Sequence, residues 1–190
     1  MTTVQAPTGA ALNTTWKNAP TQSINAGGVE FAYRQLGPNT GVPLVFLTHL
    51  AAVLDNWDPR VVDGIAATHR VITFDNRGVG ASSGSTPTTI EEMASDAVTF
   101  IRALGFEQVD LFGFSMGGMI AQVIAQEEPQ LVRKMIVAGT GPAGGEGIDK
   151  VTRITYLDAA RGLLTRQDPK GAPSGQGVPG TAGGTYQRPR

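Results

Sequence analysis

The chain has 190 residues, of which 41% are hydrophobic and 16% charged, and its formal net charge is −1. This length suits one globular domain with its own core, and the near-neutral balance excludes a strong electrostatic footprint for nucleic acid or an anionic membrane. The absence of cysteine excludes disulfides and thiolate metal sites. We expect a cytoplasmic protein, because no apolar run approaches the roughly 20 residues of a membrane span and the first 20 residues lack the pattern of a secretory signal. We also expect no cofactor and no metal.

The beginning of the chain predicts a disordered segment followed by short strands. Residues 1–20 are polar and small, with Trp16 as the only large apolar anchor, so we expect mostly disorder there. Two strands around a glycine-containing turn are expected over 21–36. The continuous apolar run at 43–48 predicts a strand buried on both faces, as in a parallel sheet.

Helices and strands alternate in the middle of the chain. We expect Asp55 or Asn56 to cap a short helix, with Asp58 also suited to a capping or turn position. Thr89 with Glu92 is expected to open the clearest helix as a capping box. The other predicted elements, in chain order, are a buried strand at 71–74, a glycine-rich loop at 75–87, a helix at 90–104, a strand at 109–112, a helix at 117–128 and a strand at 134–138.

This alternation predicts a doubly wound, mostly parallel α/β sheet with the carboxyl ends of its strands, and therefore the site, along one edge. The pattern changes after the last strand, where 149–165 predicts one more helix and the final residues are rich in glycine and proline. The expected organisation is a disordered segment at 1–20, a core at 21–148, a helix within 149–168 and a disordered tail at 169–190.

The stretch 111–120 contains most of the chemical information. Ser115 stands in Gly-x-Ser-x-Gly spacing between an expected strand and an expected helix, which is the pattern of a nucleophile elbow. Gly113 and Gly117 carry no side chains to crowd each other at such a sharp turn. The following helix would direct its free N–H groups and the positive end of its dipole toward the reacting centre.

With these pieces in order, the chain resembles the α/β-hydrolase family over roughly residues 22–168. The resemblance rests on the elbow at 113–117, on Thr-His-Leu at 48–50 after a buried strand, and on the run at 75–82. More narrowly, the chain is similar to serine esterases and cofactor-free haloperoxidases. The resemblance implies an α/β-hydrolase-like sheet that lacks the last strands and most of the cap, as if the chain were truncated just inside the cap.

The resemblance also implies the roles of individual residues. Ser115 would be the nucleophile toward a small-molecule ester or a related acyl substrate, and the backbone N–H groups of Met116 and Leu50 would form the oxyanion hole. The side chains of Leu50 and Met116 are expected to line an apolar pocket. Trp57 suits either packing or contact with the substrate.

The base that should activate the serine is missing from the expected place. The family order is serine, then acid, then histidine, but no histidine follows Ser115, and the chain has only His49 and His69. His49 suits a structural histidine of the oxyanion loop or a surrogate base, and His69 is expected at the surface. Asp75 and Arg77 are expected to form an ion-paired structural loop.

Two functions therefore remain open. One is a serine hydrolase with weak activity, because acid and histidine are missing. The other is a non-catalytic relative that acts as an interaction or dimerisation module, or an inactive fragment. The strand at 134–138 would form a sheet edge, and an exposed apolar edge favours pairing with another chain, for example as a homodimer.

Overall fold

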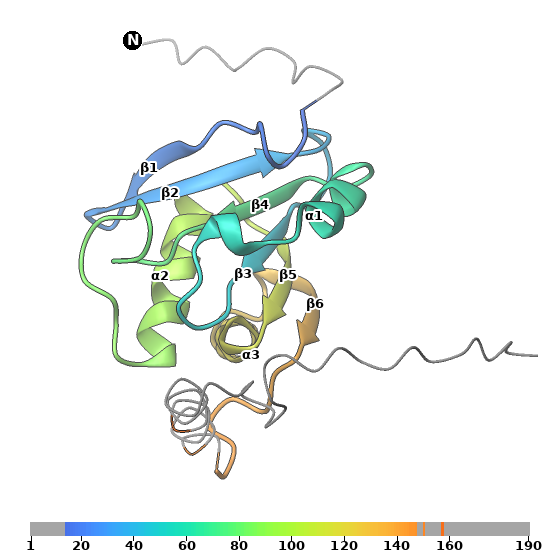
Figure 1. Ribbon diagram of the computed structural model, residues 1–190. Helices are drawn as coiled ribbons and strands as arrows, with labels where there is room; N and C mark the ends of the chain where they lie inside the picture. The colour runs from blue at the N-terminus through green and yellow to red at the C-terminus, as the bar shows by residue number, and fades with distance from the viewer. Residues whose placement is uncertain (1–13, 148–149, 151–156, 158–190) are drawn as a thin grey trace, which may run out of the picture. The chain divides into compact units, whose positions relative to one another are not determined.

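The computed structural model describes residues 14–147, 150 and 157 (Figure 1). They fall into two units, one through Gly145 and one from Glu146; all helices and strands named here belong to the first. In chain order they are β1 (Gln22–Ala26), β2 (Val29–Leu36), β3 (Leu44–Leu47), the 3-10 helix η1 (Leu54–Asn56), α1 (Pro59–Ala66), β4 (Val71–Phe74), α2 (Ile90–Ala103), β5 (Val109–Phe114), α3 (Met116–Glu127) and β6 (Val132–Ala138).

The strands form one six-stranded sheet in the order β1-β2-β4-β3-β5-β6. Strands β4, β3, β5 and β6 run parallel, while β1 and β2 form an antiparallel hairpin at one edge. Every residue of β3 and β4 is buried, as expected for parallel strands that are covered on both faces. The predicted doubly wound, mostly parallel α/β sheet is confirmed.

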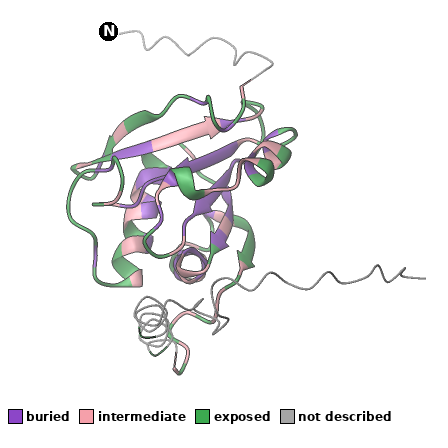
Figure 2. Ribbon diagram, in the orientation of Figure 1, coloured by how far each residue is buried: buried purple, intermediate pink, exposed green. Residues whose placement is uncertain are grey.

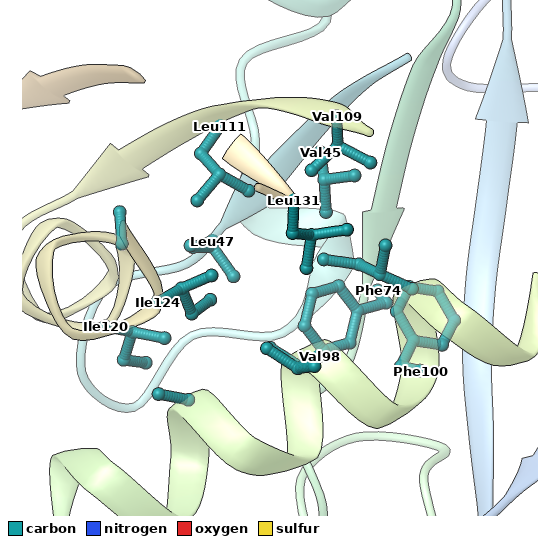
Figure 3. Packing of buried hydrophobic residues seen from close by; sticks show 14 of the residues in the cluster. Val45, Leu47, Phe74, Val98, Phe100, Val109, Leu111, Ile120, Ile124 and Leu131 are labelled. Carbon is teal, nitrogen blue, oxygen red and sulfur yellow. The ribbon is translucent and has the colours of Figure 1, made fainter. Parts of the chain in front are cut away.

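Two apolar layers cover the sheet, and the alternation of side chains along β3 separates them. Val45 and Leu47 belong to the larger layer, between the sheet and the helices α2 and α3 (Figure 3). Leu44 and Phe46 belong to the smaller layer, which includes Val62 of α1. Side chains two residues apart in a strand point to the same face, so β3 contributes to both layers. Because β3 also lies between β4 and β5, it is held firmly and fixes the position of the turn that follows it.

The helix starts differ in detail from the predictions. Glu92 N–H donates to Thr89 Oγ1 at 3.1 Å, but the Glu92 side chain accepts from Thr88 N–H rather than closing the box on Thr89. Helix α1 is capped by Asp58, which accepts from Arg60 N–H. The two residues expected to cap this helix have other partners. Asp55 forms an ion pair with Arg34, and the Asn56 side chain accepts from Val53 N–H.

The N-terminal boundary is a correction to the expected disorder through residue 20. Trp16 is only 2% exposed and Ala19 is also buried, so both belong to the layer on the α1 side. The backbone N–H of Trp16 donates to the Asp63 carboxylate at 2.6 Å, and the guanidinium of Arg34 lies 5.0 Å from the Trp16 ring centre. Residues 14–20 therefore pack against the core.

The last strand also begins earlier than predicted, at Val132 rather than residue 134. Arg133 holds this end of β6 against β5 through two hydrogen bonds to Asp110, at 2.9 and 2.6 Å. The helix expected within 149–168 lies largely outside the described residues, and the tail at 169–190 lies entirely outside them. Among the described residues, no helix combines the length and the apolar character needed to cross a bilayer.

Candidate active site

Ser115 occupies the turn between β5 and α3. Its backbone has φ 53° and ψ −117°, a conformation that favours glycine. The turn is fixed on both sides, because Ser115 N–H donates to the carbonyl of Ala138 at the end of β6 and the Ser115 carbonyl accepts from Gly118 N–H, both at 2.9 Å. A serine held in a strained conformation by several neighbours is typical of a functional turn.

Close approach of backbones explains the glycine spacing around the serine. A Cβ on Gly113 would overlap the carbonyl oxygen of Gly117 and would lie 2.6 Å from the Cα of Gly118. A Cβ on Gly117 would overlap the Leu47 carbonyl oxygen at the end of β3 and would lie 2.8 Å from that of Thr48. Glycine at both positions therefore lets the first turn of α3 pack directly against β5 and β3.

The two backbone groups expected to form an oxyanion hole come from neighbouring parts of this edge. Met116 is the first residue of α3, and the first N–H groups of a helix have no partner within it. Leu50 is 46% exposed and lies in the turn that follows β3, the strand beside β5. The next residue, Ala51, has φ 58°, and Ala52 N–H donates to the His49 carbonyl at 3.3 Å. The hydrogen bond from Ala52 to His49 thus closes a tight turn that contains Leu50 and Ala51.

The two histidines lie in different environments. His49 Nδ1 is 2.9 Å from the Leu50 carbonyl oxygen, and its ring meets the Phe114 ring edge-on, with 5.6 Å between centroids. A carbonyl only accepts, so His49 donates from Nδ1, and in the neutral imidazole the lone pair is then on Nε2. Among the described residues, no hydrogen bond joins His49 to Ser115. His69 is exposed, with Nδ1 2.8 Å from Thr68 Oγ1, just before the start of β4 and so at the opposite edge of the sheet.

An apolar cavity of about 350 Å³ opens beside the elbow, on the α1 side of the sheet. Trp57 lies in its wall, with its ring 5.7 Å from Phe112 and 6.5 Å from Phe114. Thr48 Oγ1 and Trp57 Nε1 are buried without a hydrogen-bond partner within the described part of the chain. The other lining residues are His49, Ala52, Asn56, Asp58, Val61 and Ala138.

The cavity differs in part from the predicted pocket. Leu50 and Met116, expected to line it, are not among its wall residues, whereas Trp57 is. The sequence reasoning missed Phe112 and Phe114. Their alternation with Leu111 and Gly113 was the available signal, because alternate residues of β5 face opposite sides of the sheet.

The glycine-rich loop after β4 is structural and Arg77 in it is ion-paired, as expected, but Asp75 has backbone N–H groups as its partners. The buried carboxylate of Asp75 accepts from Leu54 N–H at 2.7 Å and from Ala81 N–H at 2.9 Å. Arg77 reaches α2 instead, where its Nε lies 2.7 Å from Asp96. Asp75 thus ties η1 to the loop at 75–82, which keeps the turn after β3 in place.

The loop after β6 contributes contacts that sequence reasoning did not anticipate. Gln122 of α3 donates to the Gly141 carbonyl at 2.9 Å and accepts from Ala143 N–H at 3.1 Å. A Cβ on Gly118 would lie 2.6 Å from the Thr140 side chain, so this loop packs directly on the first turn of α3. The elbow is therefore enclosed by chain on the side of β6.

A strained serine between a parallel strand and a helix, at the carboxyl edge of a doubly wound sheet, is the arrangement of a hydrolase-type α/β protein. The chain belongs to the alpha/beta hydrolase fold family, whose profile matches residues 42–167. Among solved structures, it is similar to an alpha/beta hydrolase fold protein from Chitinophaga pinensis, with a TM-score of 0.74 and 39% identity over 77% of this chain and 54% of that chain.

Two further relatives show the range of the family. BpoC of Mycobacterium tuberculosis, named as a candidate non-heme bromoperoxidase, is 34% identical over 113 residues, which are 59% of this chain and 42% of that protein. The structure of Est816, described as an N-acyl homoserine lactone degrading enzyme, has a TM-score of 0.60 and 30% identity over 76% of this chain and 56% of that chain. The matches thus cover about half or less of the lengths of these relatives.

Proposed function

We propose that the chain is a serine hydrolase-type protein that acts on carboxylic esters or related acyl substrates through Ser115. The observation that carries this proposal is the backbone conformation of Ser115, φ 53° and ψ −117°, at the junction of β5 and α3. The likeness to Est816 supports the substrate class, because a lactone is a cyclic ester and that protein is described as degrading one. The apolar cavity beside the elbow suits the carbon chain or ring of such a substrate.

In the proposed reaction, Ser115 Oγ attacks the ester carbonyl carbon and gives its proton to a water molecule, and the carbonyl oxygen becomes negatively charged. The N–H groups of Met116 and Leu50 donate to that oxygen, an effect typically worth several kcal/mol in acyl transfer. The alcohol then leaves with a proton taken back from that water. A second water molecule attacks the acyl group, so that the acid is released with the hydroxyl of this water and its proton returns to Ser115. We propose weak activity for this chain, because oxyanion stabilisation and binding alone give about 10³–10⁴-fold over water.

His49 has a defined place in this proposal. Its Nδ1–H donates to the Leu50 carbonyl, so the ring fixes the peptide group that follows Leu50 and holds the turn that carries the Leu50 N–H. The alternative is that Nε2 accepts the proton of Ser115. His49→Asn separates the two roles, because asparagine retains an N–H donor near the Nδ1 position but has no counterpart of Nε2. Activity retained in His49→Asn and lost in His49→Ala supports the positioning role.

Labelling with a fluorophosphonate probe, together with hydrolysis of p-nitrophenyl acetate, tests the main proposal. We expect labelling at Ser115 that Ser115→Ala abolishes, and no effect of Ser85→Ala, which removes an exposed hydroxyl from the loop at 75–87. Equal labelling or equal hydrolysis in Ser115→Ala and the parent would contradict the hydrolase proposal.

A second candidate function is favoured by one observation, the exposed apolar edge strand β6. In that case the chain serves as an interaction or dimerisation module, whether or not it hydrolyses esters. Complete absence of labelling in a protein that shows native circular dichroism and a cooperative unfolding transition would favour this second function.

A further inference from the structure

The side-chain amide of Gln122 joins helix α3 to the loop that follows β6. Its Nε2 donates to the carbonyl oxygens of Gly118, at 3.0 Å, and Gly141, at 2.9 Å, and its Oε1 accepts from Ala143 N–H at 3.1 Å. Gln122 lies in the part of α3 that is buried or half-buried, residues 116–125 (Figure 2). A primary amide has two N–H donors and one acceptor oxygen, so all three groups of this side chain hold the loop and the helix together.

The loop at 139–143 packs against residues on either side of Ser115 in the chain. A Cβ on Gly118, in the first turn of α3, would lie 2.6 Å from a threonine side chain of this loop. A Cβ on Gly139, at the start of the loop, would lie 2.9 Å from the ring of Phe114, the residue before the serine. The loop is therefore in close contact with the chain that enters Ser115 and with the chain that leaves it.

The backbone of Ser115 is held between the same two pieces of chain. Its N–H donates to the carbonyl of Ala138, directly before the loop, and its carbonyl accepts from Gly118 N–H in α3, both at 2.9 Å. The Ser115 backbone, with φ 53° and ψ −117°, is strained, and a strained conformation persists only where the surrounding contacts enforce it. Gln122 bonds both to Gly118 and to the loop, so it fastens the two parts that enforce this conformation.

We propose that Gln122 is a positioning residue for Ser115, which holds the loop at 139–143 against α3 so that the Ala138 carbonyl stays in place for Ser115 N–H. This inference rests on the proposed function, in which Ser115 is the nucleophile. Gln122 lies on α3, on the opposite face of the sheet from the apolar cavity, and is not part of the cavity wall. Loss of its hydrogen bonds should therefore slow attack by Ser115 Oγ, since small displacements of a reacting group lower rates strongly, and should leave binding in the cavity unchanged.

Two substitutions at Gln122 remove its hydrogen bonds in different ways. Gln122→Met keeps the length of the side chain and removes the amide donors and the acceptor oxygen. Gln122→Glu keeps an acceptor for Ala143 N–H but sets a second oxygen against the carbonyls of Gly118 and Gly141, which only accept. Gln126→Met is the matched control, because Gln126 is an exposed residue of the same helix, one turn further along. A positioning role predicts the same kinetic defect in both Gln122 variants and none in the control.

The rate of Ser115 labelling by a fluorophosphonate, measured over a range of probe concentrations, separates attack (kinact) from binding of the probe (KI). We expect kinact to fall about tenfold in Gln122→Met and Gln122→Glu, with KI within about twofold of the parent, and no change in Gln126→Met. A parent-like kinact in both Gln122 variants, or a defect confined to KI, would overturn the positioning role. A parent that takes no label contradicts the hydrolase proposal instead, and hydrogen exchange then decides the role of Gln122.

Amide hydrogen exchange, followed by NMR, tests the hold on Ser115 without any reaction at its hydroxyl. Loosening of one segment accelerates exchange there, whereas a loss of global stability accelerates exchange throughout the core. The amide of Ile101, a fully buried residue of α2, reports the global loss. In Gln122→Met, we expect the acceleration at the Ser115 and Ala143 amides to exceed that at Ile101 by about tenfold. An acceleration at Ser115 no greater than at Ile101 would show that Gln122 does not position the serine.

Discussion

Gly117 lies against the carbonyl oxygen of Leu47 with no room between them for a side chain. This contact joins the first turn of α3 to the end of β3 and sets the position of the turn at Ser115 relative to the turn that follows β3. The carbonyl oxygen of Gly117 also lies where a Cβ on Gly113 would be. The glycines thus form one steric unit around Ser115.

Gly117→Ala should destabilise the fold strongly, because the backbone of β3 cannot move aside without disturbing the core. We expect the free energy of unfolding to fall by about 3 kcal/mol or more, measured by urea denaturation. Gly64→Ala is the matched control, since Gly64 lies in α1 with nothing within 4 Å of the added Cβ. That change should raise stability by about 0.5–1 kcal/mol. Similar effects at the two positions would contradict the close packing at the elbow.

Ser115→Gly should stabilise the protein while it removes the hydroxyl that we propose as the nucleophile. Glycine adopts φ 53° and ψ −117° without the strain that a Cβ brings, so we expect a gain of about 1 kcal/mol in the free energy of unfolding. Ser115→Ala removes the same hydroxyl but keeps the Cβ, and should leave stability nearly unchanged. Thermal unfolding of both variants separates strain from chemistry, and an equal effect of the two would show that the backbone at Ser115 stores no strain.

Much of the fold could be predicted because its signals are local. The apolar runs of β3 and β4, the helical periodicity of α2 and the glycine spacing around Ser115 each follow from a few neighbouring residues. Trp16 was recognised as the only large apolar anchor of residues 1–20, but its burial was not predicted, since a single aromatic residue in a polar stretch carries no periodicity. Its partners, Asp63 and Arg34, are far away in the chain.

The candidate site could be predicted less completely than the fold. The position of Ser115 follows from a motif, whereas the apolar cavity depends on which face of β5 is left uncovered by helices. Local alternation places Phe112 and Phe114 on one face of β5, but only the structure shows that this face borders the cavity. The partner of Asp75 was missed in the same way, because backbone N–H groups have no sequence signature.

Asp75→Asn should destabilise the turn after β3. The buried carboxylate accepts from two backbone N–H groups, and an amide would direct one NH₂ group toward a donor. We expect a loss of about 1–3 kcal/mol in the free energy of unfolding, typical of a buried unsatisfied donor. Asp55→Asn, at a largely exposed carboxylate paired with Arg34, should cost at most about 1 kcal/mol. A loss no greater in Asp75→Asn than in Asp55→Asn would argue against the role of Asp75.

Trp16→Ala tests whether the segment before residue 20 belongs to the core. The buried indole packs in the layer on the α1 side and receives the Arg34 guanidinium on its face. Its removal should lower the free energy of unfolding by about 3–5 kcal/mol. Lys17→Ala, one residue further along at an exposed position, should change it by less than about 0.5 kcal/mol. An unchanged unfolding midpoint for Trp16→Ala would show that residues 14–20 contribute nothing to the core.

The contribution of Asp58 to the stability of the fold, at the start of α1, depends on pH. The hydrogen bonds from the Arg60 side chain and then from its backbone N–H lower the pKa of Asp58 from 3.8 to about 2. A carboxylate whose pKa is lowered on folding contributes stability above its unfolded value, and that contribution is lost as the pH falls through the folded value. The relevant window therefore runs from about pH 4 down to pH 2. Asp58→Asn keeps a capping oxygen but has no charge, so the parent should be more stable than this variant at pH 5 and should lose that advantage toward pH 2. Urea denaturation of both proteins across this range checks the result, and a stability difference independent of pH would rule out the charge of Asp58 as its source.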